Sequence, residues 1–242
     1  MKINIKRFNQ YKENIINEYQ VNNSNLLQSL IEIRNNLDAT LTFRCGCKSG
    51  VCGSCAVMVN GVEKLACKTT IKENDLIEPI KNCKVVKDLI VDVSHETLLI
   101  KTTNLSVKDD FIHDEIDKDD IKNIDLQSNC ILCNSCYSSC PVYDVNKNFL
   151  GPFALTRALR YAKDKKVYDN NQIIDSIQAN GIWDCTLCSS CTLVCPQGID
   201  PKSDIMQLQN LSVQKGYSNP YTQNFNFDNN FDSFGGFNPN GF

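Results

Sequence analysis

Hydrophobic and polar residues alternate at the start of the chain, and this period of two predicts a β-strand over residues 2–6. Residues 14–21 predict a second strand, antiparallel to the first. Leucine and isoleucine then recur at helical spacing over residues 25–37, and we expect Ser24 to cap that helix. The chain thus begins as a small unit that combines strands with a helix.

A β-hairpin is the next predicted element. Residues 56–59 and 62–66 are rich in apolar residues and flank Asn60-Gly61, the pair that two-residue hairpin turns favour. Residues 76–80 predict a last strand, with Pro79 near its end or at a sheet edge. Two strands, a helix and further strands are what a β-grasp domain needs, and we predict such a domain over residues 1–92.

The pattern changes in the rest of the chain. Residues 93–127 are acidic with interspersed lysines, which predicts a solvated connector with partial helix. Residues 128–218 predict an all-α domain, whose clearest helix is 151–162 with Pro152 in its first turn. Residues 219–242 are rich in Asn, Phe and Gly without any period, which is typical of disorder. Docking of these phenylalanines on a partner subunit is the alternative.

Composition and charge narrow the class of protein. The chain has 242 residues and a formal net charge of −3, which argues against a general nucleic-acid binder. No apolar run approaches the roughly 20 residues that span a bilayer, so we expect membrane association only through partners. The first 19 residues do not resemble a signal peptide, and the 14 cysteines are clustered. In a reducing compartment such clusters favour metal binding over disulfides.

Two near-identical cysteine strings lie in the predicted helical domain, at 130–141 and 185–196, and each ends in Cys-Pro. In this spacing the first three cysteines hold one iron–sulfur cluster, and the fourth ligates the cluster of the other string. We therefore predict two crossed thiol sets, numbered after a first set that lies earlier in the chain and is described below. The second thiol set is Cys130, Cys133, Cys136 and Cys195, and the third thiol set is Cys140, Cys185, Cys188 and Cys191. By ligand count both clusters would be [4Fe–4S]; the third set would hold [3Fe–4S] if Cys188 does not ligate.

The first thiol set lies in the N-terminal region and consists of Cys47, Cys52, Cys55 and Cys67. Its x4 and x2 gaps with a distant fourth cysteine are the plant-type spacing for [2Fe–2S]. Glycines between these cysteines let backbone amides approach the inorganic sulfides. A four-thiolate zinc site, and with it a zinc-stabilised interaction module, is the alternative. We expect Cys45 and Cys83 to be non-ligand thiols, with Cys83 on a strand-edge loop.

Other candidate residues are few. His95 and His113 are isolated from each other, and a surface or connector position is expected for both. Trp183 is either a core aromatic or a residue that packs over a cluster or contacts a quinone headgroup. The chain contains no glycine-rich dinucleotide motif, no phosphate loop and no plausible nucleophile–His–acid set. We therefore predict no catalytic residue on this chain.

The order of these motifs resembles the iron–sulfur subunit of succinate dehydrogenases and fumarate reductases over about residues 1–210. The likeness includes residues 40–44, 52–55, 64–67, 87–92, 130–133, 140–141, 151–152 and 183–186. It implies electron transfer between an FAD-containing, dicarboxylate-binding subunit and a quinone-side subunit, in the tricarboxylic acid cycle or in anaerobic respiration. An iron–sulfur subunit of another flavin dehydrogenase, of the glycolate oxidase or thiol-linked fumarate reductase type, is the alternative.

One departure from the commonest family members is Cys188. Those members lack a cysteine at this position and carry [3Fe–4S], whereas this chain offers a fourth thiolate. The departure resembles the methylmenaquinol:fumarate reductase-like branch, whose third subunit is cysteine-rich and peripheral to the membrane. It implies a complex attached to the bacterial cytoplasmic membrane, on its cytoplasmic or, by co-export, periplasmic face. The sequence leaves the direction of the reaction and the quinone open.

Overall fold

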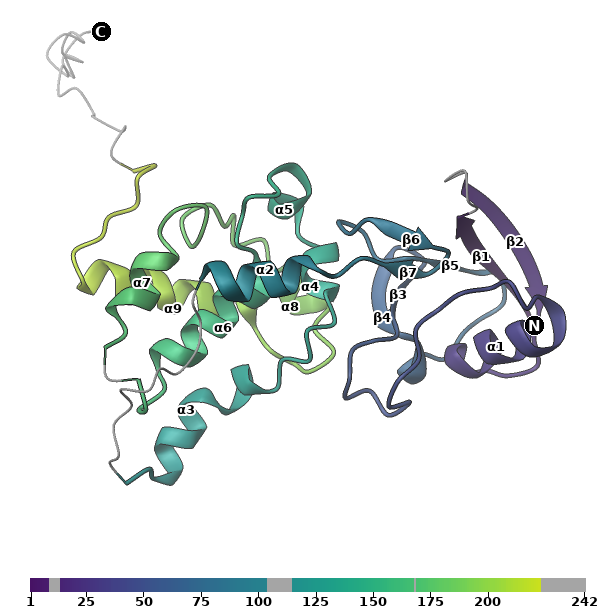
Figure 1. Ribbon diagram of the computed structural model, residues 1–242, viewed down its shortest axis with the longest axis horizontal. Helices are drawn as coiled ribbons and strands as arrows, with labels where there is room; N and C mark the ends of the chain where they lie inside the picture. The colour runs from purple at the N-terminus through teal and green to yellow at the C-terminus, as the bar shows by residue number, and fades with distance from the viewer. Residues whose placement is uncertain (9–13, 104–114, 168, 223–242) are drawn as a thin grey trace, which may run out of the picture.

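The computed structural model describes residues 1–8, 14–103, 115–167 and 169–222. A β-sheet with one helix beside it forms one half of the molecule, and a group of helices forms the other half (Figure 1). The two halves lie side by side along the long axis of the molecule, and the chain passes from the first half to the second just before helix α2, His95–Thr102 (Figure 1).

The N-terminal half contains a sheet with the strand order β2-β1-β5-β3-β4. Its strands are β1 Lys2–Phe8, β2 Asn14–Gln20, β3 Ala56–Val59, β4 Val62–Leu65 and β5 Asp75–Glu78. The antiparallel β1–β2 pair and the β3–β4 hairpin are confirmed, and Asn60 and Gly61 take the positive φ angles, 51° and 77°, of a two-residue turn. Strand β5 lies between β1, to which it is parallel, and β3. Pro79 directly follows β5, near its end as predicted.

The helix of this half differs from the prediction in its cap and its end. Helix α1 spans Leu26–Glu32, and Asn25, not Ser24, caps it by accepting a hydrogen bond from the Gln28 amide at 3.2 Å. The chain then continues as a π-helical turn over Ile33–Leu37. Helix α1 and the sheet share a fully buried apolar core: Ile3, Ile5, Leu26, Leu30 and Ile77.

Three short elements complete this half. Ala66–Lys68 forms a 3₁₀ turn, and strands β6 Val85–Lys87 and β7 Ile90–Val91 pair as a small second sheet that the sequence did not predict. Leu89, between these strands, is buried in the core of the N-terminal half. The small sheet therefore covers one side of that core.

The C-terminal half is helical in its described residues. Its helices are α2 His95–Thr102, α3 Lys118–Ser128, α4 Ser135–Ser138, α5 Pro141–Val145, α6 Pro152–Ala162, α7 Asn171–Ser176, α8 Ser190–Leu193 and α9 Pro201–Gln214. Helix α6 matches the predicted helix, begins with Pro152, and contributes Leu155 and Leu159 to a core that Leu208 of α9 shares. Helices α2 and α3 form the helical part of the predicted connector, and residues 223–242 of the predicted tail lie outside the described residues.

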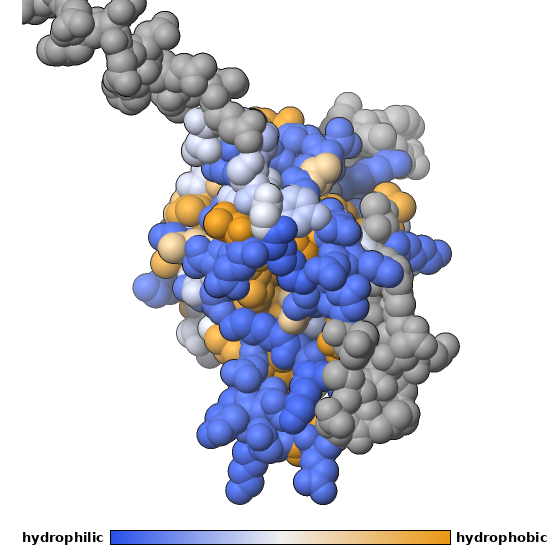
Figure 2. Space-filling model, turned by 90° about the vertical axis from the view of Figure 1, so that its left-hand side faces the viewer, coloured by the Kyte–Doolittle hydropathy of each residue, from blue (hydrophilic) through white to orange (hydrophobic). Residues whose placement is uncertain are grey.

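The outer end of the helical half is mostly hydrophilic, with separate hydrophobic spots (Figure 2). Helix α3, which has no buried residue, begins with a capping box between Asp117 and Asp120. Within the described residues, none of the helices has the length and apolar character that crossing a membrane requires.

Helix α4, in the helical half, forms hydrogen bonds with the N-terminal half. Ser138 of α4 donates a hydrogen bond to the carboxylate of Glu63 of β4 at 2.6 Å, and the Lys81 amide donates to Ser138 Oγ at 2.8 Å. Asn82 Nδ2 donates to the carbonyl of Tyr137 at 2.8 Å. Because Glu63 and Ser138 are both buried, these hydrogen bonds fix how the halves sit against each other.

Candidate metal centres

Backbone amides surround the first thiol set. The amides of Ser49 and Val51 each lie 3.4 Å from Cys47 Sγ, and the Cys47 amide lies 3.4 Å from Cys52 Sγ. Hydrogen bonds from Ser49, followed by the Val51 amide, lower the pKa of Cys47 to about 5. The loop therefore favours a thiolate, the form in which cysteine ligates metals, at the position of Cys47.

The other members of the first set lie against the same loop. A Cβ atom added to Gly46 would meet Ser54 Oγ at 2.8 Å and Cys52 Sγ at 2.9 Å, so a side chain here would require both of these side chains to shift. Cys55 and Cys67 are buried, and burial, together with the neighbouring Cys67 thiol, raises the pKa of Cys55 to about 11. The charge of Cys52 also acts to raise the pKa of Cys55, so the four predicted members are neighbours, and the contacts between them do not include the exposed Cys45.

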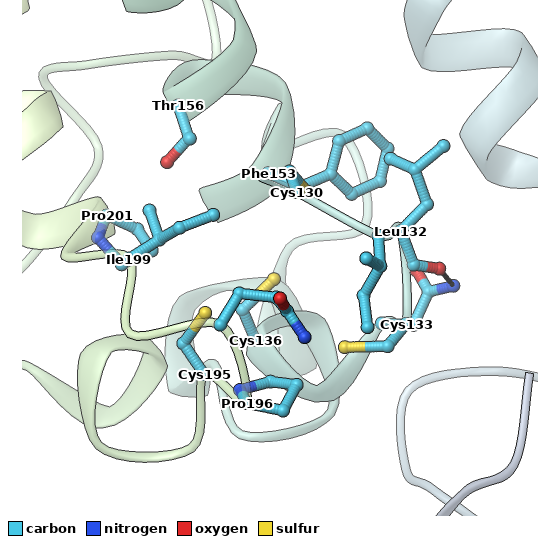
Figure 3. Close-up of a pocket in the computed structure, with 13 residues that line it drawn as sticks. Cys130, Leu132, Cys133, Cys136, Phe153, Thr156, Cys195, Pro196, Ile199 and Pro201 are labelled. Atoms are coloured by element: carbon cyan, nitrogen blue, oxygen red, sulfur yellow. Dashed lines mark hydrogen bonds between the residues drawn. The ribbon is translucent and has the colours of Figure 1, made fainter. Parts of the chain in front are cut away.

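The second thiol set lines one cavity, which it shares with Phe153 and Ile199 (Figure 3). Cys195 comes from the other cysteine string, so the structure brings the predicted crossed set together. Burial raises the pKa of Cys136 well above its usual value, and the nearby thiols of Cys133, Cys130, Cys191 and Cys195 raise it further.

The third thiol set lines a second cavity, again with one crossed member, Cys140. Burial and then the nearby Cys185 and Cys140 raise the pKa of Cys191 to about 12. Cys188 is the exposed member of the set: burial works to raise its pKa, but hydrogen bonds with Ser190 outweigh burial and lower it. Cys188 therefore lies with the other three thiols, and its surroundings stabilise the thiolate more than those of an ordinary cysteine do.

Two protein-family models match the chain. The 2Fe-2S iron-sulfur cluster binding domain matches residues 2–97, and the 4Fe-4S dicluster domain matches residues 127–199. A fumarate reductase iron-sulfur subunit of Haemophilus influenzae is 34% identical over 232 residues, which cover 86% of this chain and 91% of that protein. The chain belongs to the iron–sulfur subunits of the fumarate reductase and succinate dehydrogenase family. The predicted family and the predicted electron-transfer role are confirmed.

Further likenesses differ in how much of each relative they cover. An 8-methylmenaquinol:fumarate reductase iron-sulfur subunit of Wolinella succinogenes is 34% identical over 206 residues, 79% of this chain and 65% of that protein. An uncharacterized iron-sulfur protein of Methanocaldococcus jannaschii is 35% identical over 90% of this chain, which spans only 45% of that protein's length. A solved chain of the Mycobacterium smegmatis Sdh1 complex in the apo form matches with a TM-score of 0.79 at 21% identity, over 90% of this chain and 97% of that chain. The predicted α+β fold of a β-grasp ferredoxin domain and a helical two-cluster domain is confirmed.

The cysteine sets of this iron–sulfur subunit fit the clusters that its domains imply. Each set offers four thiols, the number that [2Fe–2S] and [4Fe–4S] clusters take from a protein. The second and third sets stand around cavities, and backbone amides point at sulfurs of the first set. Within the described residues, no three His, Cys, Asp or Glu side chains are placed to share a single metal ion.

The two cysteine strings of the subunit have the same backbone geometry. Leu132 and Asn134 in one string, and Leu187 and Ser189 in the other, all take positive φ angles between 52° and 70°. Each string then enters a short helix, α4 or α8. The spacing of the cysteines predicted the repeat of thiols but not this repeat of left-handed residues. Its signals in the sequence are the leucine before the second cysteine and the Cys-x-Ser segment, which both strings share.

The remaining candidates take ordinary structural places. His95 lies in α2, in the predicted connector, but it is not a surface residue: its ring lies 5.2 Å from the Tyr137 ring, beside Tyr143 and Phe153. Trp183 is partly buried against the helical core and donates a hydrogen bond from Nε1 to Gln178 Oε1 at 2.9 Å.

Two more candidates remain. Cys83 is half-buried outside the three thiol sets, and burial followed by the charge of Glu96 raises its pKa to about 11. His113 lies outside the described residues.

Proposed function

We propose that this subunit holds three clusters, [2Fe–2S] in the first thiol set and [4Fe–4S] in the second and third sets. It serves a complex that oxidises succinate with a quinone or reduces fumarate with a quinol. The observation that carries the proposal is the crossing of the cysteine strings, which puts four thiols around each of two separate cavities. When bound, the clusters supply one-electron transfer.

The chain holds the three sets in a row. Gly53, in the loop of the first set, packs against Cys133 of the second set. Cys136 of the second set lies close enough to Cys191 of the third set for the charge of one thiol to affect the other. The residues between the sets thus hold each set next to the following one.

The partners we propose are an FAD-containing catalytic subunit and a quinone-side subunit, either cysteine-rich or a membrane anchor. The complex would be peripheral to a bacterial cytoplasmic membrane, attached through those partners. Support comes from the names of the relatives, which are subunits of fumarate reductase and of 8-methylmenaquinol:fumarate reductase. The fourth thiol at Cys188 favours the branch of the family that has a cysteine-rich third subunit.

The decisive experiment is to count and identify the clusters in anaerobically purified protein. We expect acid-labile sulfide, visible charge-transfer absorbance, and an electron paramagnetic resonance (EPR) spectrum of the dithionite-reduced protein from one [2Fe–2S] and two [4Fe–4S] clusters. The oxidised Cys188→Ser variant should gain a [3Fe–4S] signal, because one iron loses its thiolate. Cys83→Ser, the matched control, should leave every signal unchanged.

Two results would contradict the proposal. A strong [3Fe–4S] signal in the oxidised wild type that Cys188→Ser does not alter would exclude Cys188 as a ligand. Colourless protein with stoichiometric zinc would favour the zinc-stabilised module. Co-purification with a different flavin dehydrogenase would replace the proposed partner and leave the cluster assignment intact.

A further inference from the structure

Gln197 joins the second cysteine string to the loop of the first thiol set. It lies two residues after Cys195 and lines the cavity of the second thiol set. Its Nε2 donates a hydrogen bond at 3.0 Å to the carbonyl oxygen of Gly50, which lies 147 residues earlier in the chain. Gly50 belongs to the loop that carries the first three cysteines of the first set. The side chain of Gln197 is therefore a direct link between the two sets.

The peptide group between Gly50 and Val51 is hydrogen-bonded at both of its ends. Its carbonyl oxygen accepts the hydrogen bond from Gln197, and its N–H belongs to Val51, whose amide nitrogen lies 3.4 Å from Cys47 Sγ. Because a peptide group is planar, fixing the direction of its carbonyl also fixes the direction of its N–H. Gln197 thus sets the direction of an amide that points at a ligand sulfur of the first set.

The surroundings of Gly50 hold this peptide group in place. Gly50 is buried, although Ser49 and Val51 on either side of it are exposed. A Cβ atom added to Gly50 would meet Lys68 Cε at 2.7 Å, so the Lys68 side chain lies directly against the backbone here. A buried carbonyl needs a hydrogen-bond partner, and Gln197 supplies one.

We propose that Gln197 is a positioning residue that raises the reduction potential of the [2Fe–2S] cluster in the first thiol set. A hydrogen bond to a peptide oxygen polarises the peptide group and makes its N–H a stronger donor. Hydrogen bonds to the sulfurs stabilise the negative charge that reduction adds to a cluster, and so raise its potential. This inference rests on the proposed function, and it ties the potential of the first cluster to a residue of the second string.

The test is a redox titration of the full-length protein with its clusters, in which EPR follows the reduced [2Fe–2S] signal. Gln197→Met removes the donor at similar size, Gln197→Ala removes most of the side chain, and Gln197→Lys keeps a donor. Gln209→Met is the matched control, because Gln209 Nε2 also donates to a backbone carbonyl, that of Ile182 at 2.8 Å, but within the helical half. Hydrogen–deuterium exchange of the segment around Val51, measured by mass spectrometry, is a second readout that does not depend on the potential.

Gln197→Met and Gln197→Ala should each lower the one-electron equilibrium constant for reduction of [2Fe–2S] about threefold, which corresponds to about 28 mV. Exchange around Val51 should become faster in the same two variants. Gln197→Lys should keep slow exchange and a potential at or above that of wild type, and Gln209→Met should match wild type in both readouts.

Three results would overturn the inference: an unchanged [2Fe–2S] potential in both Gln197→Met and Gln197→Ala, an equal fall in Gln209→Met, or an equal fall in Gln197→Lys. Wild-type protein without a [2Fe–2S] signal and without matching iron and sulfide would instead overturn the proposed function.

Discussion

A Cβ atom added to Gly53 would lie 2.9 Å from Cβ of Cys133, so the loop of the first thiol set touches the string of the second set with no side chain between them. The same added atom would lie 2.7 Å from the carbonyl oxygen of Ile131. Both neighbours are too close for a methyl group, and one of them is backbone. Glycine at this position therefore fixes the closest approach of the two sets.

We predict that Gly53→Ala increases the separation of the first two sets. The variant should destabilise the protein by more than the roughly 1–2 kcal/mol that a left-handed alanine costs, because the contact with Cys133 must also open. The magnetic coupling between the two reduced clusters should weaken, which EPR line widths and relaxation measure.

Gly61→Ala is the matched control for this substitution. Gly61 has a φ of 77°, close to the 70° of Gly53, but an added Cβ would have nothing within 4 Å. This control should show the backbone cost alone and leave the coupling unchanged. Equal effects of the two substitutions on the coupling would contradict a role for the contact between Gly53 and Cys133.

The hydrogen bond between Ser138 and Glu63 should contribute measurably to stability. Ser138→Ala removes a donor at 2.6 Å from a buried carboxylate, and we expect a loss of about 1–3 kcal/mol in the free energy of unfolding. Ser176→Ala is the control, because Ser176 donates only to a carbonyl of its own helix α7. Urea unfolding followed by circular dichroism measures the free energy of unfolding of both variants. An equal unfolding midpoint for Ser138→Ala and wild type would contradict a stabilising role for the Ser138–Glu63 hydrogen bond.

Local signals explain which parts of the fold the sequence predicted. The Asn60-Gly61 turn and the alternation in β1 depend on neighbouring residues only, and both were found. The cap of α1 was misplaced by one residue because both Ser24 and Asn25 are good caps. The choice depends on a distant contact: Asn25 Nδ2 donates to the carbonyl of Cys67 at 3.1 Å.

The candidate site also has features that local sequence predicts and features that depend on distant contacts. Cysteine spacing predicted which thiols gather, since ligands must lie around a common centre. Spacing did not indicate that Gly53 contacts Cys133, or that Ser138 donates a hydrogen bond to Glu63. Those features arise from the packing of segments that lie far apart in the chain. Strands β6 and β7 were also missed, because they are only three and two residues long.

Asp88 should make the N-terminal half sensitive to acid. Its carboxylate, 1% exposed, accepts hydrogen bonds from Arg7 Nε at 2.8 Å and from the Thr42 amide at 2.9 Å. Burial works to raise the pKa of Asp88, but the hydrogen bonds from Arg7 and Thr42 outweigh it and lower that pKa. Because the folded pKa lies below the unfolded value of about 3.9, the stabilisation is complete above that value and is lost as the pH falls through the folded pKa.

Asp88→Asn should therefore lower the free energy of unfolding by about 1–3 kcal/mol at pH 7, because the hydrogen bonds from Arg7 and Thr42 then go to a neutral amide, while Arg7 keeps its second carboxylate partner, Asp38, at 2.6 Å. The difference from wild type should stay constant between about pH 8 and pH 5 and shrink below about pH 4. Asp119→Asn, which breaks an exposed pair with Lys122, should change stability by less than about 1 kcal/mol. A difference that is independent of pH down to pH 3 would contradict the assignment to ionised Asp88.

Removal of the clusters should make Cys47 the most reactive thiol of those whose pKa is shifted. Its pKa of about 5 means that the thiolate predominates at pH 6, whereas Cys83, with a pKa of about 11, stays protonated. Brief alkylation of cluster-free protein at pH 6, followed by peptide mass spectrometry, should label Cys47 and spare Cys83. The cluster-loaded protein should be protected at Cys47, because the thiolate is then bound to iron.

Labelling of Cys47 at the same rate with and without clusters would exclude it as a ligand. Slow labelling in the cluster-free protein alone would show that the amides of Ser49 and Val51 need the cluster to take up their positions.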